Sequence, residues 1–107
     1  MFVSPGLAVP YYAVIFSSVR RMDDASYDAM AEEMDGLVRE QPGFLAMESV
    51  RDADGNGITV CYWRSLEDVK NWKANVLHKQ AQEMGKAGWY KEYAVRIAEV
   101  TESYERV

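Results

Sequence analysis

The chain has 107 residues, a length typical of one domain and too short for two ordinary hydrophobic cores. Its 12 basic and 17 acidic side chains give a formal net charge of -5, which argues against nucleic acid or an anionic membrane as a partner. Hydrophobic residues make up 49% and aromatic residues 12%, enough for a core with amphipathic rings to spare, which excludes a disordered chain.

The cysteine and histidine content limits the cellular compartments and the cofactors that we expect for this protein. The single cysteine, Cys61, cannot form an internal disulfide, and with one histidine it cannot complete a closed zinc site, so we expect a cytoplasmic protein without a bound metal. The apolar stretch 7–16 contains Pro10 and is far shorter than the roughly 20 residues of a membrane span. Because no glycine-rich nucleotide or flavin motif is present, we expect no such cofactor.

The first half of the chain predicts a tail, a strand and a helix. Residues 1–9 lack a periodic pattern and predict a disordered or loosely packed tail, ahead of a domain over residues 10–107. Residues 11–16 are aromatic and β-branched and predict a strand. Apolar positions at spacings of three and four predict a helix over 24–40, with an aspartate at 23 or 24 as its N-cap.

Two strand-like runs follow, over 44–50 and 58–63. The residues between them, 52–57, contain Asp-Gly and Asn-Gly pairs, which are strong hairpin signals. We therefore expect the two strands to pair antiparallel.

The last third predicts a second helix and a fourth strand. Ser65 resembles the first residue of a capping box, and an apolar stripe then runs along a helix that ends near Gly85. Beyond Gly88, residues 93–100 alternate well enough to form a strand. The order strand, helix, strand, strand, helix, strand predicts a ferredoxin-like split βαβ fold of the α+β class, with a four-stranded antiparallel sheet and both helices on one face.

The faces of the predicted strands indicate an assembly. Alternate residues of 11–16 and of 58–63 are apolar on both sides of the strand. Two helices cover one face of such a sheet, and leaving the other face in water would forgo roughly 1.5 to 3 kcal/mol per large side chain. We expect a homodimer through that sheet face; a monomer shielded by its own tail is the alternative.

Few side chains in the sequence are candidates for catalysis or substrate binding. His78 is the one side chain whose ordinary pKa lies near neutrality, and it is a candidate base or acid. Trp63 and Trp72 are candidate walls of a substrate site, and Tyr90 with Arg96 could lie at a cavity mouth. Each also has a structural interpretation: a partly exposed histidine on the surface of a helix, and aromatic rings that pack in a core.

Two sequence motifs resemble those of the antibiotic biosynthesis monooxygenase family. They are Tyr62-Trp63-Arg64-Ser65-Leu66-Glu67 followed by Trp72, and Gln41-Pro42-Gly43-Phe44 upstream. The resemblance extends from about residue 10 to 104, and the later run is similar to a bacterial subgroup without a well-defined reaction. It implies a dimeric ferredoxin-like α/β barrel with a cavity in each subunit between sheet and helices.

The family resemblance implies two possible activities. Some members oxygenate phenols without metal or flavin, and others bind haem and open its ring. Haem-degrading members carry an Asn on the first strand, a Trp on the second helix and a His ten positions later. Trp72 matches the Trp, but the tenth position is Gln82 and the first strand offers Ser17 or Ser18, so a haem ligand would have to be His78.

We therefore interpret the sequence as a cofactor-independent monooxygenase that oxidises a small aromatic, phenolic or quinol-like compound with dioxygen. The alternatives are a non-catalytic dimeric small-molecule-binding protein and a haem-binding or haem-degrading monooxygenase. Because dioxygen accepts electrons readily from an ionised phenol, the protein must promote that ionisation in a dry pocket. The expected catalytic residues are His78 and Trp72, and the expected substrate-binding residues are Ser17, Trp63, Tyr90 and Arg96.

Overall fold

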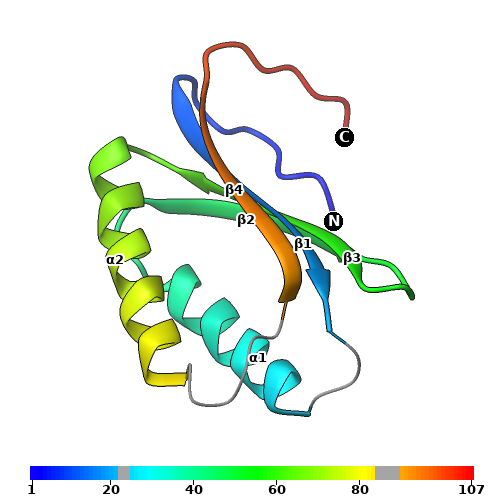
Figure 1. Cartoon of the computed structure of the whole chain (residues 1–107). Coiled ribbons are helices and arrows are strands. Elements are labelled where there is room, and N and C mark those ends of the chain that lie inside the picture. Colours follow the sequence, from blue (N-terminus) through cyan, green and yellow to red (C-terminus); the bar gives the residue numbers. More distant parts are fainter. Residues whose placement is uncertain (22–24, 84–89) are drawn as a thin grey trace.

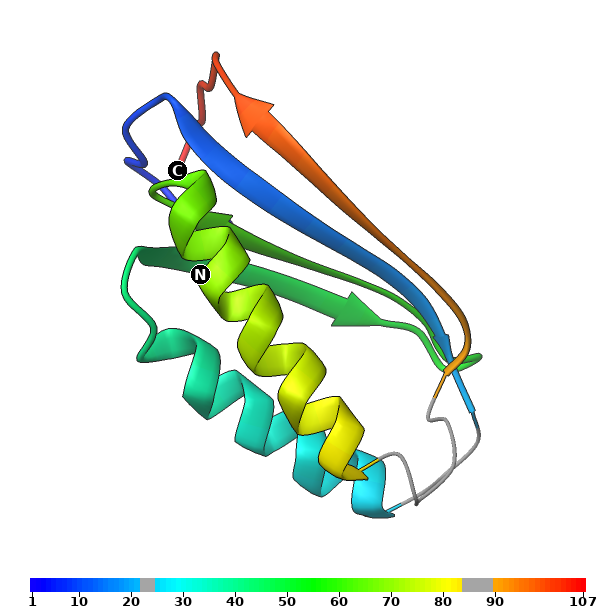
Figure 2. The ribbon, with the colours of Figure 1, turned by 60° about the vertical axis from the view of Figure 1, so that its left-hand side comes forward.

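The computed structural model describes residues 1–21, 25–83 and 90–107, with the side chains of these ranges apart from those of 25–27 and 77–83. The elements are β1 (Tyr11–Arg20), α1 (Ala25–Arg39), β2 (Phe44–Arg51), β3 (Asn56–Trp63), α2 (Leu66–Glu83) and β4 (Tyr90–Val100). The strands form one antiparallel sheet in the order β2-β3-β1-β4, and both helices lie on one face of it (Figures 1 and 2). The predicted ferredoxin-like α+β fold is confirmed.

Strands β1 and β4 are longer than their local patterns predict. β1 continues four residues past position 16, through Ser17 and Ser18, and β4 begins at Tyr90 rather than at 93. The central position of β1 explains its length, because it pairs with β3 on one side and β4 on the other. Ladder hydrogen bonds on both edges satisfy the backbone of residues that have little strand propensity of their own.

The predicted hairpin between β2 and β3 is confirmed, although β3 begins at Asn56 rather than at 58. The Asp52 carboxylate accepts hydrogen bonds from the backbone N–H groups of Asp54 and Asn56, both at 2.9 Å. Gly55 adopts a φ of 93°, a conformation that residues with a Cβ rarely adopt. The hydrogen bonds of the Asp52 side chain and the backbone conformation of Gly55 therefore stabilise this turn together.

Ser65 caps the N-terminus of α2 in a variant of the capping box, as the sequence predicts. The Ser65 hydroxyl oxygen accepts the N–H of Asp68 at 3.1 Å and donates to the Asp68 carboxylate at 2.8 Å. Gly43, with a φ of 82°, lies so close that a Cβ there would come within 2.0 Å of Asp68 Oδ2. The Arg64 N–H also donates to the Gly43 carbonyl at 2.8 Å. The two helix-strand connections are thus joined at a point where a side chain on residue 43 cannot fit.

The packed core lies at this same end of the molecule. Trp63, fully buried at the end of β3, contacts Val38 of α1 and Val69 of α2, which are each 3% exposed. Its ring stacks on Trp72 at 6.2 Å and meets Phe44 edge to face at 5.8 Å. Away from this end the helices diverge from the sheet (Figure 2). A cavity lined by residues of both layers lies between the helices and the sheet.

The opposite face of the sheet is apolar and partly covered. Val50 and Ile58 lie on it and are 61% and 48% exposed. The segment before β1 crosses part of this face (Figure 1), where the Ser4 N–H donates to the Glu48 carboxylate at 2.9 Å. Glu48 also accepts the Tyr62 hydroxyl at 2.6 Å. The tail is thus hydrogen-bonded to this face at Glu48, and Val50 and Ile58 stay exposed.

Neither helix, over the residues that the structure describes, combines the length and the hydropathy that a membrane span requires.

Candidate functional site

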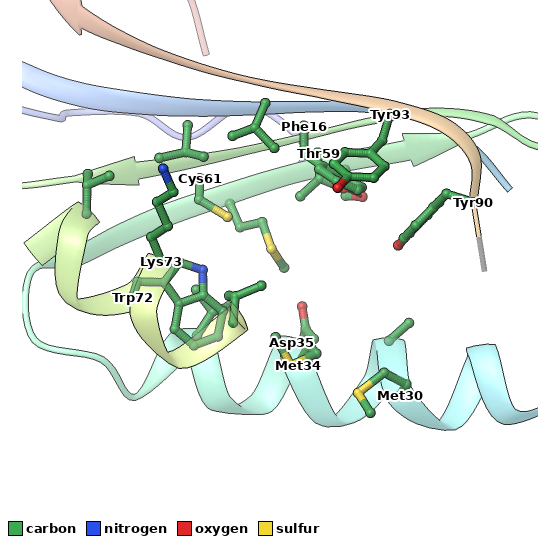
Figure 3. Close-up of a pocket in the computed structure, with 18 of the residues that line it drawn as sticks. Phe16, Met30, Met34, Asp35, Thr59, Cys61, Trp72, Lys73, Tyr90 and Tyr93 are labelled. Carbon is green, nitrogen blue, oxygen red and sulfur yellow. Dashed lines mark hydrogen bonds between the residues drawn. The ribbon is translucent and has the colours of Figure 1, made fainter. Parts of the chain in front are cut away.

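A cavity of about 780 Å³ separates the helices from the sheet (Figure 3). Its volume lies within the range of roughly 300 to 1,000 Å³ that small-molecule sites occupy. Its lining is mainly apolar and comes from both layers: Val14, Phe16, Cys61, Met34, Val38 and Trp72 are among its residues. Because α1 packs mainly on β2, and α2 on β1 and β3, the cavity opens along β4, whose Val95 and Ile97 line it and stay exposed.

One end of the cavity is closed by Trp72. The helical stripe of α2 places Val69, Trp72 and Val76 on the face that lines the cavity. Trp63 stacks behind Trp72 and fixes the plane of its ring. A flat, apolar wall results, against which an aromatic ring can lie.

The other end is an aromatic cluster of Phe16, Tyr90 and Tyr93, which Figure 3 shows beneath β4. The Phe16 ring lies 5.1 Å from that of Tyr90 and 5.8 Å from that of Tyr93. The guanidinium of Arg51 lies 5.9 Å from the centre of the Tyr90 ring, a cation-π distance.

Arg51 is held against the sheet at this end. Its Nη2 donates to Ser18 Oγ at 2.7 Å, and its Nη1 donates to the carbonyl oxygen of Gly55. The guanidinium lies flat over Gly57, its cross-strand partner, where a Cβ would come within 2.6 Å of Arg51 Cζ. The glycine therefore makes the room in which this cation lies.

Further polar groups border the cavity from the helices and the sheet. Asp35 of α1 accepts two hydrogen bonds from Arg39, at 3.0 and 3.3 Å. The hydroxyls of Ser49 and Thr59, opposite each other on β2 and β3, are bonded at 2.6 Å. Lys73 extends from α2 toward the sheet (Figure 3).

The thiol of Cys61 faces the cavity and is kept protonated. Burial raises its pKa to about 11, with the Arg39 guanidinium opposing the shift and Asp35 adding to it. A neutral thiol in this setting acts as a small apolar side chain rather than as a nucleophile or a metal ligand.

Cys61 should consequently react slowly with iodoacetamide near pH 8, because its thiolate fraction there is about a hundredfold smaller than that of a thiol with an ordinary pKa. The rate should rise with pH and reach half of its maximum near pH 11, where half of the thiol is ionised. Mass spectrometry of timed samples measures it. A Cys61→Ser, Tyr104→Cys double variant, whose thiol would be at a fully exposed position, is the control. Equal rates for the two proteins at pH 8 would contradict the shift.

Two of the residues that we expected at the site line the cavity. Trp72 and Tyr90 line the cavity at its two ends, and Trp63 supports Trp72 without reaching the cavity itself. His78 belongs to α2, but its side chain lies outside the described residues, so its role as a base stays a prediction.

Ser17 and Arg96 lie elsewhere. They border a shallow hollow that includes Ile58, on the face of the sheet away from the helices. The alternation of side chains along β1 explains the difference: Phe16, next to Ser17, is the residue that points into the cavity. Arg51 and Lys73 border the cavity and were missed.

The comparisons with known proteins agree with this architecture. The family model described as Antibiotic biosynthesis monooxygenase matches residues 10–84. The chain is 50% identical over 99 residues to the Bacillus subtilis (strain 168) protein named Uncharacterized protein YqjZ, a match that spans 92% of this chain and 87% of that protein.

Two solved structures share the fold at low sequence identity. A variant of SnoaB, a cofactor-independent oxygenase from Streptomyces nogalater, has a TM-score of 0.73 and 10% identity, over 92% of this chain and all of that one. The hydroxynitrile lyase of Passiflora edulis has a TM-score of 0.68 and 14% identity, over 90% of this chain and 98% of that one. On the family match and the close relative, the chain belongs to the antibiotic biosynthesis monooxygenase family.

Proposed function

We propose that this protein is a cofactor-independent monooxygenase that oxidises a small phenolic or quinol-like aromatic compound, within a domain of residues 10–107. The observation that carries the proposal is the cavity between sheet and helices, large enough for a small aromatic molecule and lined mainly by apolar groups. Family membership and the likeness to SnoaB support the same chemistry.

The reaction follows from the electronic structure of the substrate. An ionised phenol or enol can reduce dioxygen directly, after which one oxygen atom enters the product and the other leaves as water. For an anthrone the balance closes without a further reductant: anthrone and dioxygen give anthraquinone and water. The protein has to accept the proton and hold the ring in a dry site.

Named residues take these roles. Trp72 supplies the wall for the ring, and Tyr90 borders the opposite end of the cavity. His78 is the proposed base. The placement of Ser17 and Arg96 on the other face of the sheet favours a role for them at an interface between chains.

Haem has weaker support in this cavity. Its iron requires an axial ligand such as histidine, thiolate or tyrosinate. Cys61 offers a protonated thiol rather than a thiolate, and His78 comes six positions after Trp72 rather than the ten at which haem-degrading members carry their histidine. We therefore propose no step through haem.

An oxygen electrode tests the proposed activity. With an anthrone at pH 7, the wild-type protein should consume dioxygen above the uncatalysed rate, and anthraquinone should form in equal amount. Trp72→Ala should lower the rate by about tenfold or more, because the ring loses the wall that orients it. Asn71→Ala, at the exposed neighbouring position of α2, should leave it unchanged.

Two outcomes would revise the proposal. A ring that binds without oxygen uptake would indicate the non-catalytic binding protein. Equal oxygen uptake by wild type and His78→Ala would remove His78 as the base while leaving the activity.

We also propose that two chains associate through the sheet face opposite the helices. Val50 and Ile58 are exposed there, and Ile15 and Val60 pair beside them on the same face. Exposed apolar side chains that are grouped on one face and bordered by polar ones such as Ser17 and Arg96 are typical of an interaction site. A homodimer would also bring Ser17 and Arg96 of each chain to the contact.

A further inference from the structure

Lys73 occupies a position of α2 where the helical pattern favours an apolar residue. It comes four residues after Val69 and three before Val76, and both of these line the cavity, as Lys73 itself does. Figure 3 shows its side chain running from α2 toward the sheet, with the nitrogen beside the strands rather than directed away from the cavity. Lys73 is thus an exposed cation that also borders the cavity.

The charges that line the cavity balance, unlike those of the whole protein. The chain carries a net charge of -5. The cavity lining has two cations, Arg51 and Lys73, and two carboxylates, Glu32 and Asp35, and therefore no net charge. An anion is repelled less at such a site than over the acidic remainder of the protein.

Asp35, the carboxylate of the lining with a hydrogen-bonded partner on α1, is paired with Arg39 rather than with Lys73. Among the described residues, no carboxylate is paired with Lys73. Lys73 is itself exposed, so its charge is partly screened in the empty cavity. A ligand whose ring lies against Trp72 would displace water beside the ammonium and strengthen its pairing with an anionic group. The site thus combines a flat ring-binding surface, Trp72, with a cation on the adjacent residue.

We propose that the cavity binds an acidic aromatic molecule, with its anionic group on Lys73 and its ring against Trp72. The proposal rests on the proposed function and names the class of its substrate. A nearby ammonium favours the ionised form of a phenol or carboxylic acid. Lys73 would therefore stabilise the electron-rich anion from which dioxygen takes electrons, while the proton goes to a separate base.

Two dyes that share one ring system test the proposal. The probes are 8-anilinonaphthalene-1-sulfonate and N-phenyl-1-naphthylamine, which differ by the sulfonate, and fluorescence titration measures the affinity of each. Lys73→Met, which keeps most of the side-chain stem, should weaken binding of the anionic dye about tenfold and leave the neutral dye unchanged. Lys73→Arg should restore most of the affinity for the anionic dye.

Lys70→Met is the matched control. It removes the same charge from the same helix, at an exposed position that does not line the cavity, and should leave both affinities unchanged. Protection of Cys61 from iodoacetamide by each dye would show that the dye lies in the cavity, since the thiol is part of the lining.

An unchanged affinity of Lys73→Met for the anionic dye would overturn the proposal. An equal loss for both dyes would also overturn it, since Lys73 would then act through packing alone. Because the titration needs no turnover, a failure of oxygen uptake with the dye preference intact would refute the proposed oxygenase but not the anionic site.

Discussion

Trp63→Ala should lower the free energy of unfolding by about 3 to 5 kcal/mol, a large part of the roughly 5 to 15 kcal/mol that holds a domain of this size folded. The Trp63 side chain is fully buried where β3, α1 and α2 meet. Its removal leaves Val38, Val69 and Trp72 without the group they share. Urea unfolding followed by circular dichroism, at one fixed protein concentration, measures the loss.

Two further variants separate the cavity effect from a loss of polar contacts. Trp63→Phe should cost less, because the buried indole Nε1 has no hydrogen-bond partner among the described residues to lose. Tyr104→Ala, at a position 99% exposed, should leave stability within about 0.5 kcal/mol of wild type. A Trp63→Ala protein as stable as Tyr104→Ala would show that the core does not depend on this residue.

Ile58→Asp should convert the proposed homodimer into a monomer at micromolar concentration. The aspartate would place a charge in the apolar face of the sheet, and burying it against the partner would cost several kcal/mol, on the order reported for an uncompensated buried charge. Light scattering coupled to size-exclusion chromatography should give about twice the 12.2 kDa of one chain for wild type and the mass of one chain for the variant.

Leu66→Asp is the matched control for the dimer. Leu66 is 45% exposed, close to the 48% of Ile58, but it begins α2 on the other side of the molecule, where an aspartate suits a helix N-terminus. This variant should keep the dimer mass. A wild-type protein that stays at the mass of one chain would favour the alternative in which the tail alone covers the sheet.

The order of helices and strands could be predicted because the spacing of apolar residues differs between the two kinds of element. The alternation of residues 58–63 and the stripe of α2 are local signals, and the turn at Asp52 to Asn56 carries its own chemistry. The ends of β1 could not be predicted in the same way. They depend on hydrogen bonds to strands whose paired residues come 37 or more positions later, as Asn56 does after Val19, and no local pattern contains such contacts.

The candidate site was predicted less completely than the fold. Trp72 was found because the helical stripe fixes its direction, whereas Ser17 was expected at the site although its neighbour Phe16 is the residue that lines the cavity. On a strand with apolar residues on both faces, the pattern alone does not say which face the helices cover. Arg51 was missed because its position depends on the bare backbone of Gly57 across the hairpin.

Among the side chains that the structure describes, the fully buried packing is concentrated around Trp63 and the Gly43 junction, at one end of the helices. At the other end, among the described residues, the Arg20–Asp28 ion pair at 3.2 Å links β1 to α1, and the aspartate is largely in water. We expect substitutions near this ion pair to change the width of the cavity while the packed core around Trp63 stays unchanged. The same fold could in this way bind ligands of different width in related proteins.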